Sequence, residues 1–179
     1  MAKLIKWTAA LSLGCAVLFS VCCRIVSYVM FLPFAITFGT IFYHLSMRLL
    51  VALVFTRVMN NKADYHKKRY QVSTGEMKLY GKLRVKKWKD KMPTYVKALF
   101  DPGVHTWDEI AQAMCQAELV HKMSAALSFL PVAGGIFFGA FPVFITTSVL
   151  AALFDMTFVI MQRYNRYRLM KLLEHGRGK

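Results

Sequence analysis

A chain of 179 residues with 56% hydrophobic side chains and a mean hydropathy of +0.39 carries more apolar surface than a soluble domain of this size buries. Its 24 Lys and Arg residues against 9 Asp and Glu residues give a net charge of +15, which excludes an acidic disordered chain. We therefore expect an all-α membrane protein, with about four transmembrane helices in a single membrane domain over residues 1–179.

The apolar residues fall in two blocks, and the first runs from Leu4 to about Phe55. It contains enough residues for two membrane spans, because about 20 residues cross the ~30 Å hydrocarbon layer. Arg24 and Ser27, followed by Pro33, mark the expected turn within this block. The sequence thus predicts a first span over about 4–23 and a second over about 28–55.

Basic residues separate the apolar blocks and follow the last one. The stretch 57–105 carries thirteen Lys and Arg residues against four acidic ones, and the tail 163–179 carries six against one. Positive charge marks the cytoplasmic side of membrane proteins, and Lys3 and Lys6 mark the N-terminus in the same way. Two spans in each block then place both termini and the section 57–121 in the cytoplasm.

A basic section with interleaved Tyr and Trp residues also suggests nucleic-acid binding. Between membrane spans, the same charges attract anionic lipid headgroups, each contributing about 1 kcal/mol near the surface. We expect membrane lipids as partners and no nucleic acid.

A helix start is predicted just before the second apolar block. Thr106 and Glu109 have the spacing of a capping box, so a helix should begin at Trp107. This helix carries Glu118 and His121 to the membrane boundary, and their separation of three residues places them on one helix face.

The second apolar block, from Met123 to about Met161, is interrupted by residues that break helices. Pro131, Gly134 and Pro142 divide it into expected spans over about 123–138 and 142–161. The third span should be short and broken.

Glu118 and His121 are candidates for general-base catalysis, because a carboxylate beside an imidazole fixes the ring and stabilises its protonated form. The alternative is a helix end whose polar groups meet lipid headgroups. His44 and Arg48, one turn apart, indicate a structural role. Asp155 lies within the fourth span and should point into the bundle toward His44, Arg48 or His121.

The sequence motifs of several other enzyme classes are absent from the chain. There is no Gly-x-Ser-x-Gly elbow, phosphate-binding loop, His-Glu-x-x-His pair or Cys-x-x-Cys pair. The His-x4-Asp motif of glycerolipid acyltransferases is also missing. We expect no metal and no bound cofactor.

Four strings resemble, in the same order, those of the glycosyl-diaponeurosporenoate acyltransferase family of small bacterial membrane proteins. They are Glu76-x-x-x-Tyr80, Val85–Pro93, Ala117–His121 and Gln162–Leu169. The family's named member attaches a fatty acyl chain to a sugar hydroxyl of a carotenoid glycolipid.

This resemblance implies acyl transfer to a hydroxyl or amine of a glycolipid or similar amphiphilic acceptor at the cytoplasmic leaflet. The acyl donor would be acyl-CoA, acylated carrier protein or a phospholipid. His121 would be the base and Glu118 its orienting partner. The phosphate-bearing donor and the acceptor would be bound by Lys87, Trp88, Lys89, Asp90, Gln162, Arg163, Asn165, Arg166 and Arg168, with Lys86 beside them.

The chain departs from the family pattern beside the candidate base. Ala113 and Gln116 stand where the family usually has Glu and Arg, and Lys122 stands where it has Trp. Tyr167 and Asp155 replace the usual Pro and Asn. A non-enzymatic lipid-binding scaffold or subunit of a larger complex remains the alternative function, and the oligomeric state is left open.

Overall fold

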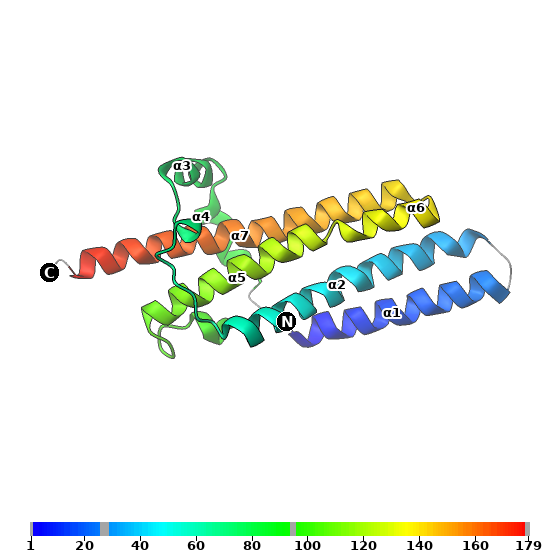
Figure 1. Cartoon of the computed structure of the whole chain (residues 1–179), viewed down its shortest axis with the longest axis horizontal. Coiled ribbons are helices and arrows are strands. Elements are labelled where there is room, and N and C mark those ends of the chain that lie inside the picture. Colours follow the sequence, from blue (N-terminus) through cyan, green and yellow to red (C-terminus); the bar gives the residue numbers. More distant parts are fainter. Residues whose placement is uncertain (1, 26–28, 94–95, 178–179) are drawn as a thin grey trace. The chain divides into compact units, whose positions relative to one another are not determined.

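The computed structural model describes residues 2–25, 29–93 and 96–177, and its regular structure within these ranges is helical throughout, with no strand (Figure 1). The all-α class predicted from the sequence is confirmed. The helices are α1 (Ala2–Ile25), α2 (Leu32–Met59), α3 (Thr74–Lys82), α4 (Val85–Trp88), α5 (Trp107–Leu127), α6 (Gly135–Phe138) and α7 (Phe141–Arg177). Short 3-10 helices are η1 (Val29–Phe31), η2 (Lys68–Tyr70), η3 (Lys89–Lys91), η4 (Lys97–Phe100) and η5 (Leu130–Gly134).

Among the residues that the structure describes, four helical segments are long and apolar enough to cross a membrane, as predicted. They are Lys3–Ile25, Leu32–Met59, Trp107–Phe138 and Phe141–Glu174. The chain is thus a multi-pass membrane protein. The turn residue Ser27 and the expected helix start near residue 28 lie outside the described residues. Within the described residues, α2 has Pro33 in its first turn, where a missing N–H costs no helix hydrogen bond.

The fourth helix is much longer than its predicted span of 142–161. α7 continues to Arg177, so the expected basic tail is largely the helix itself. The reason lies in the sequence, because no Pro or Gly stands between Pro142 and Gly176 to end the helix.

The third segment is broken, as predicted, and the break has a specific hydrogen-bond partner. Pro131 has no N–H, so it cannot donate to the carbonyl of Leu127, four residues earlier. The hydroxyl of Tyr43 on α2 donates to that carbonyl at 2.9 Å. A carbonyl that would otherwise be unsatisfied in a nonpolar environment is thereby paired.

The turn between α6 and α7 depends on two glycines. Gly139 has a φ of +66°, which an L side chain rarely adopts. A Cβ on Gly135 would lie 2.5 Å from the Phe141 ring, so only glycine fits against α7 here.

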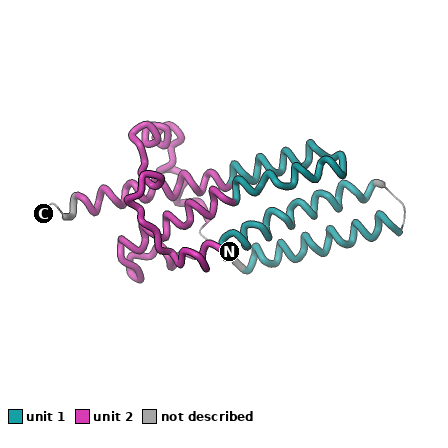
Figure 2. Tube along the Cα trace, viewed as in Figure 1, with its two compact units in different colours: residues 1–52, 124–154 teal, residues 53–123, 155–179 magenta. Residues whose placement is uncertain are grey.

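The chain forms two compact units (Figure 2). Unit 1 consists of residues 1–52 and 124–154, and unit 2 of residues 53–123 and 155–179. In unit 1 many large apolar side chains are exposed, including Leu11 at 67% and Leu150 at 62%, as expected for surfaces in contact with lipid.

Unit 2 contains two buried apolar clusters that join its helices. One is formed by α5 and α7 and includes Ile110, Met114 and Leu169. The other joins α3 and α4 to α7 through Tyr80, Val85 and Tyr164. These clusters fix the ends of α5 and α7 on which the candidate site residues lie.

Candidate active site

The helix that carries His121 begins where the sequence predicts. The backbone N–H of Glu109 donates to Thr106 Oγ1 at 3.3 Å, and the Thr106 N–H donates to Glu109 Oε2 at 2.8 Å. This is the expected capping box, and α5 begins at Trp107. Because the helix then continues unbroken to Leu127, Glu118 and His121 lie three residues apart within it.

The imidazole of His121 is hydrogen-bonded to a buried carboxylate. Its Nδ1 lies 3.0 Å from Asp155 Oδ1, and the Asp155 side chain is 1% exposed whereas that of His121 is 25% exposed. A carboxylate partner makes Nδ1 the protonated nitrogen. No hydrogen bond within the described chain uses Nε2, so this atom is available to accept a proton.

An aromatic ring holds the same imidazole from one face. Phe158 stacks on His121 with ring centroids 4.5 Å apart and ring planes 8° apart. Asp155 and Phe158 are three residues apart on α7, so one face of that helix supplies both contacts. Asp155 is buried and contacts His121, one of the three partners considered from the sequence.

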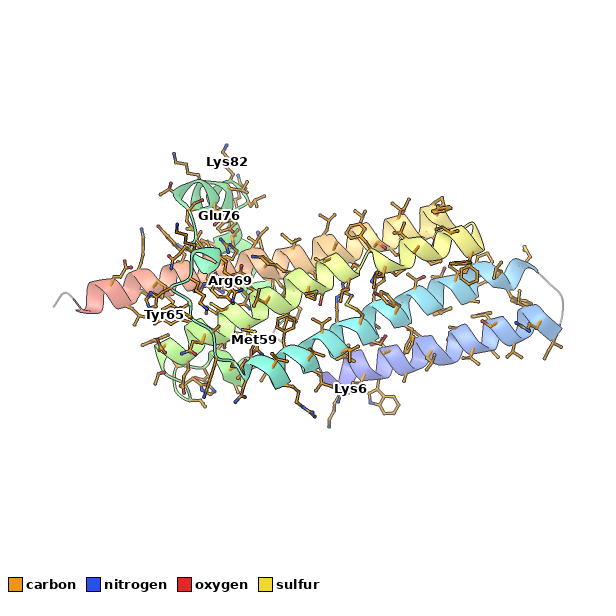
Figure 3. All side chains as sticks on the ribbon, viewed as in Figure 1. Lys6, Met59, Tyr65, Arg69, Glu76 and Lys82 are labelled. Atoms are coloured by element: carbon orange, nitrogen blue, oxygen red, sulfur yellow. The ribbon has the colours of Figure 1, made fainter. Side chains whose placement is uncertain are left out.

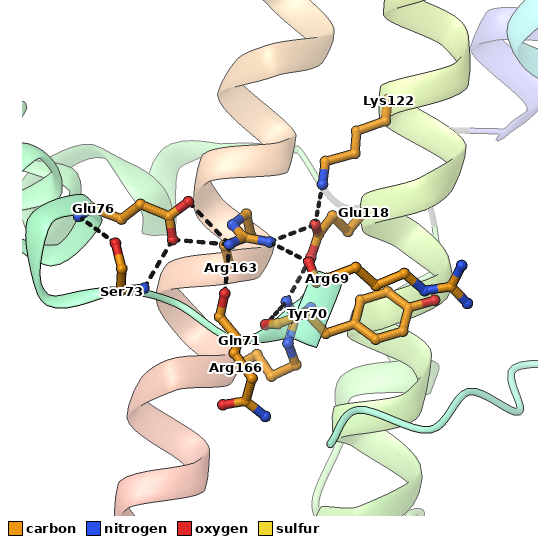
Figure 4. Close-up of polar contacts among 9 residues, drawn as sticks. All are labelled: Arg69, Tyr70, Gln71, Ser73, Glu76, Glu118, Lys122, Arg163 and Arg166. Carbon is orange, nitrogen blue, oxygen red and sulfur yellow. Dashed lines mark hydrogen bonds and ion pairs between the residues drawn. The ribbon is translucent and has the colours of Figure 1, made fainter. Parts of the chain in front are cut away.

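Among the described residues, no hydrogen bond joins Glu118 to His121, although their spacing on one helix face suggested that they pair. Its Oε1 accepts hydrogen bonds from Lys122 at 2.5 Å and from Arg163 at 2.8 Å, and its Oε2 accepts one from Arg166 at 2.6 Å (Figure 4). The Glu118 side chain is fully buried. The physical reason is that two guanidinium groups of α7, also three residues apart, donate hydrogen bonds to both oxygens of this carboxylate.

Arg163 joins three segments of unit 2 (Figure 4). Besides Glu118, its guanidinium binds both carboxylate oxygens of Glu76 on α3, at 3.0 and 2.8 Å. It also donates to the carbonyls of Arg69 and Gln71 at 3.0 and 2.8 Å. These acceptors occupy both terminal nitrogens of the planar guanidinium, an arrangement that a lysine ammonium cannot reproduce.

Arg166 completes the connection to the same loop. Its Nη2 donates to the carbonyl of Tyr70 at 2.6 Å, so the two arginines bind three successive carbonyls. The hydroxyl of Tyr70 is buried without a hydrogen-bond partner among the described residues. Burial raises the pKa of the Tyr70 phenol.

Arg163 and Arg166, which the sequence suggested as contacts for a donor phosphate, are engaged inside the chain. Both residues are buried, at 7% and 2% exposure, and their guanidinium groups bind carboxylates and carbonyls of the chain itself. Arg168, on the next turn of α7, is exposed and lies over the Tyr164 ring at 6.0 Å. It is the arginine of this group that is accessible.

The other predicted binding residues differ in accessibility. Trp88 is half-buried, and its Nε1 donates to the Leu83 carbonyl at 3.0 Å, which is a structural contact. Lys89 forms an ion pair with Asp90 at 2.7 Å. Lys86 and Lys87 are exposed, Asn165 is half-buried and Gln162 is buried.

His44 and Arg48 lie in unit 1. Arg48 donates to the carbonyl of His44 at 3.0 Å and to that of Ala151 on α7 at 3.1 Å. This links α2 to α7 and agrees with the predicted structural role. Within the described residues, no group of His, Cys, Asp or Glu side chains has the geometry to hold a metal ion.

Sequence reasoning missed Glu76 as a partner of the buried arginines. Ser73 and Glu76 form a capping box at the start of α3, a signal visible in the sequence as Ser-x-x-Glu. The same carboxylate also binds Arg163, which no local pattern indicates.

Comparisons with known proteins bear on this region. A family model described as glycosyl-4,4'-diaponeurosporenoate acyltransferase matches residues 61–175, which is 115 of the 179 residues. The match includes His121, Asp155 and the Glu118 contacts. Searches of curated proteins and of solved structures gave no match.

Proposed function

Because this chain belongs to the glycosyl-4,4'-diaponeurosporenoate acyltransferase family, we propose that it transfers a fatty acyl chain to a sugar hydroxyl of a glycosylated amphiphile, with His121 as general base. Membership makes the chain an acyltransferase, so the non-enzymatic scaffold considered above does not apply. The observation that carries the residue assignment is the 3.0 Å contact between His121 Nδ1 and the buried Asp155 carboxylate.

His121 supplies what a sugar hydroxyl lacks at neutral pH. Nε2 takes the hydroxyl proton as the oxygen attacks the acyl carbonyl, and the new C–O bond forms a tetrahedral intermediate. The bond between carbonyl carbon and leaving group then breaks, and the imidazolium returns the proton to the departing thiolate or alkoxide. Asp155 stabilises the positive imidazolium during this step and acts as a positioning residue.

Glu118 has a positioning role in this proposal in place of the predicted contact with the base. Its carboxylate ties α5 to Arg163 and Arg166 of α7, one turn before His121. These ion pairs fix the two helices that supply the imidazole and its carboxylate partner.

The exposed bases Lys86, Lys87 and Arg168 are the proposed contacts for a phosphate-bearing acyl donor. They are accessible, whereas Arg163 and Arg166 are committed to carboxylates inside unit 2. Phosphate is bound well by guanidinium and ammonium groups. A donor with a phosphorylated headgroup or carrier arm therefore fits this surface.

We further propose that the reaction takes place at the cytoplasmic leaflet, with both termini in the cytoplasm. The charge distribution supports this orientation, because the basic residues gather in the section after α2 and in the last part of α7.

The catalytic assignment is tested by substitutions in cells that make the glycosyl carotenoid acceptor, with the acylated product measured by mass spectrometry. His121→Ala should lower product formation by about 10²-fold or more, since a positioned His contributes roughly 10²–10⁴-fold. Asp155→Leu, which removes the hydrogen-bond partner of the ring, should lower it by about tenfold, whereas Asp155→Asn, which keeps a hydrogen-bonding group and is the residue usual in the family at this position, should lower it less.

A matched control is His66→Ala, because His66 is an exposed histidine of the loop after α2. This variant should form product at the rate of the unmodified protein. Each variant must also elute as a monodisperse species in detergent. Near-normal product from a folded His121→Ala variant would contradict the mechanism.

The orientation is tested by cysteine labelling at Lys62→Cys, because Lys62 is exposed in the section after α2. An impermeant maleimide should label it only after the cells are permeabilised. The unmodified chain is the control for its native cysteines, three half-buried and one buried. Labelling of Lys62→Cys in intact cells would contradict the proposed orientation.

A further inference from the structure

The short helix α3 is attached to α7 by one of its faces. Tyr80 is 5% exposed and packs with Tyr164 of α7, and Met77 packs against the same cluster. Glu76 adds the ion pair with Arg163. These contacts define which side of α3 points inward.

The exposed residues of α3 and of the turn that follows it combine positive charge opposite this inward side with leucine side chains beside it. Lys78 and Lys82 are exposed, and so are Leu79 at 51% and Leu83 at 45%. Residues four apart lie side by side on a helix, so the two lysines and the two leucines form adjacent rows. Arg84, also exposed, follows directly. We call Lys78, Leu79 and Lys82 of α3, together with Leu83 and Arg84 of the turn that follows the helix, the outer face of α3. Figure 3 shows Lys82 pointing away from the helices.

The part of α7 to which α3 is attached indicates that the outer face lies close to the edge of the membrane. The cluster that holds α3 and α4 includes Ile160 and Tyr164, which lie within the candidate span Phe141–Glu174. The first charged residue of α7 after Asp155 is Arg163, so the helix changes from apolar to basic at the level where α3 is attached. A change of this kind is typical of the boundary between hydrocarbon and headgroups.

We propose that the outer face of α3 lies on the surface of an anionic bilayer. Leu79 and Leu83 enter the headgroup region, while Lys78, Lys82 and Arg84 contact lipid phosphates. Helices that lie in a membrane interface combine an apolar row with flanking bases in this way. The inference concerns a part of the chain that the proposed catalytic step does not use.

The two features together favour lipid over an acidic protein partner. Charge complementarity alone would serve either, because both present negative groups to the bases. The exposed leucine pair beside a membrane-spanning helix is the pattern that a lipid surface matches, since headgroups and acyl chains are both within reach.

Hydrogen exchange of the full-length protein in nanodiscs tests the proposal. The peptide covering residues 74–83 should exchange on the order of tenfold more slowly in phosphatidylglycerol than in phosphatidylcholine, because each base adds favourable energy only at the anionic surface. The difference should shrink in 1 M salt, since roughly molar salt screens charges beyond about 3 Å. Equal exchange in both lipids would overturn the proposal.

Two pairs of substitutions show whether the effect belongs to this face. Lys78→Gln with Lys82→Gln should remove the difference between lipids, whereas Lys67→Gln with Lys68→Gln, two exposed bases on η2 and just before it, should preserve it. Leu79→Ser with Leu83→Ser should increase exchange in phosphatidylglycerol. If both lysine pairs remove the difference equally, or if an acidic acyl carrier protein in phosphatidylcholine nanodiscs protects α3 as strongly as phosphatidylglycerol does, the proposal is wrong.

Discussion

The two units of the chain satisfy their polar groups in different ways. In unit 1, hydroxyls return to the backbone of their own helix: Ser12, Thr40 and Ser46 each donate to the carbonyl four residues earlier at 2.7 Å. In unit 2, charged side chains that are far apart in the sequence bind one another: Arg166 and Glu118 are 48 positions apart, and Arg163 and Glu76 are 87 positions apart.

This difference determines where a single substitution does most damage. A hydroxyl bonded to its own helix can be removed with little effect, because the carbonyl keeps its backbone partner. A buried ion shared among several partners cannot, because its loss leaves opposite charges uncompensated. Unit 2 should therefore be sensitive at single residues and unit 1 tolerant.

Glu118→Gln in unit 2 should cause the largest loss of stability. The variant leaves Lys122, Arg163 and Arg166 around a neutral amide, and we expect the free energy of unfolding to fall by about 3 kcal/mol. Thermal unfolding in detergent measures it. Glu109→Gln, at the exposed cap of α5, is the control and should change stability far less, because its side chain is solvated and Gln can still accept the capping hydrogen bond.

Arg163→Lys tests whether the planar fork matters beyond its charge. Lysine keeps the positive charge but cannot bind Glu76, Glu118 and two loop carbonyls together, so we expect a loss of about 2 kcal/mol. Hydrogen exchange should also increase in the loop around Gln71. Unchanged stability would show that charge alone is sufficient in unit 2.

Tyr43→Phe should have a smaller effect, although it removes a contact between helices of unit 1. The Leu127 carbonyl loses its donor, and hydrogen bonds between membrane helices contribute on average ~0.6 kcal/mol. Thermal unfolding of Tyr43→Phe beside Tyr65→Phe, which removes a tyrosine hydroxyl from unit 2, compares the two units directly. A cost above that of Arg163→Lys would reverse the comparison.

Ser46→Ala should have the smallest effect, within about 0.5 kcal/mol, because its hydroxyl serves only its own helix. The same unfolding measurement applies, and Thr40→Val should behave alike. If either variant lowers stability as much as Glu118→Gln, the local hydrogen bonds of unit 1 are not dispensable.

Local chemistry explains which parts of the fold were predictable. The capping box at Thr106 and the break at Pro131 act within a few residues, and both appear where the sequence places them. The length of α7 was underestimated because hydropathy marks where a membrane segment ends and not where a helix ends. Basic residues continue a helix as well as apolar ones do.

The candidate site was predictable in its residues but not in their pairing. Helical spacing placed Glu118 and His121 on one face, but spacing cannot rank partners from other helices. Arg163 and Arg166 on α7 take Glu118, and Asp155 on the same helix binds His121. Which carboxylate serves which base depends on the rotation and level of α7 beside α5, and these are set by packing.

The hydrogen bond from Tyr43 to Leu127 joins an early part of the chain to a later one, so its donor is synthesised before its acceptor. Ribosomes synthesise α2 before the break at Pro131, because Tyr43 precedes Leu127 by 84 positions. When the broken segment leaves the ribosome, the group that pairs its exposed carbonyl is therefore already part of a completed helix. The broken segment around Pro131, which has an unpaired backbone carbonyl when it is alone, is therefore synthesised after the helix that supplies its hydrogen-bond donor.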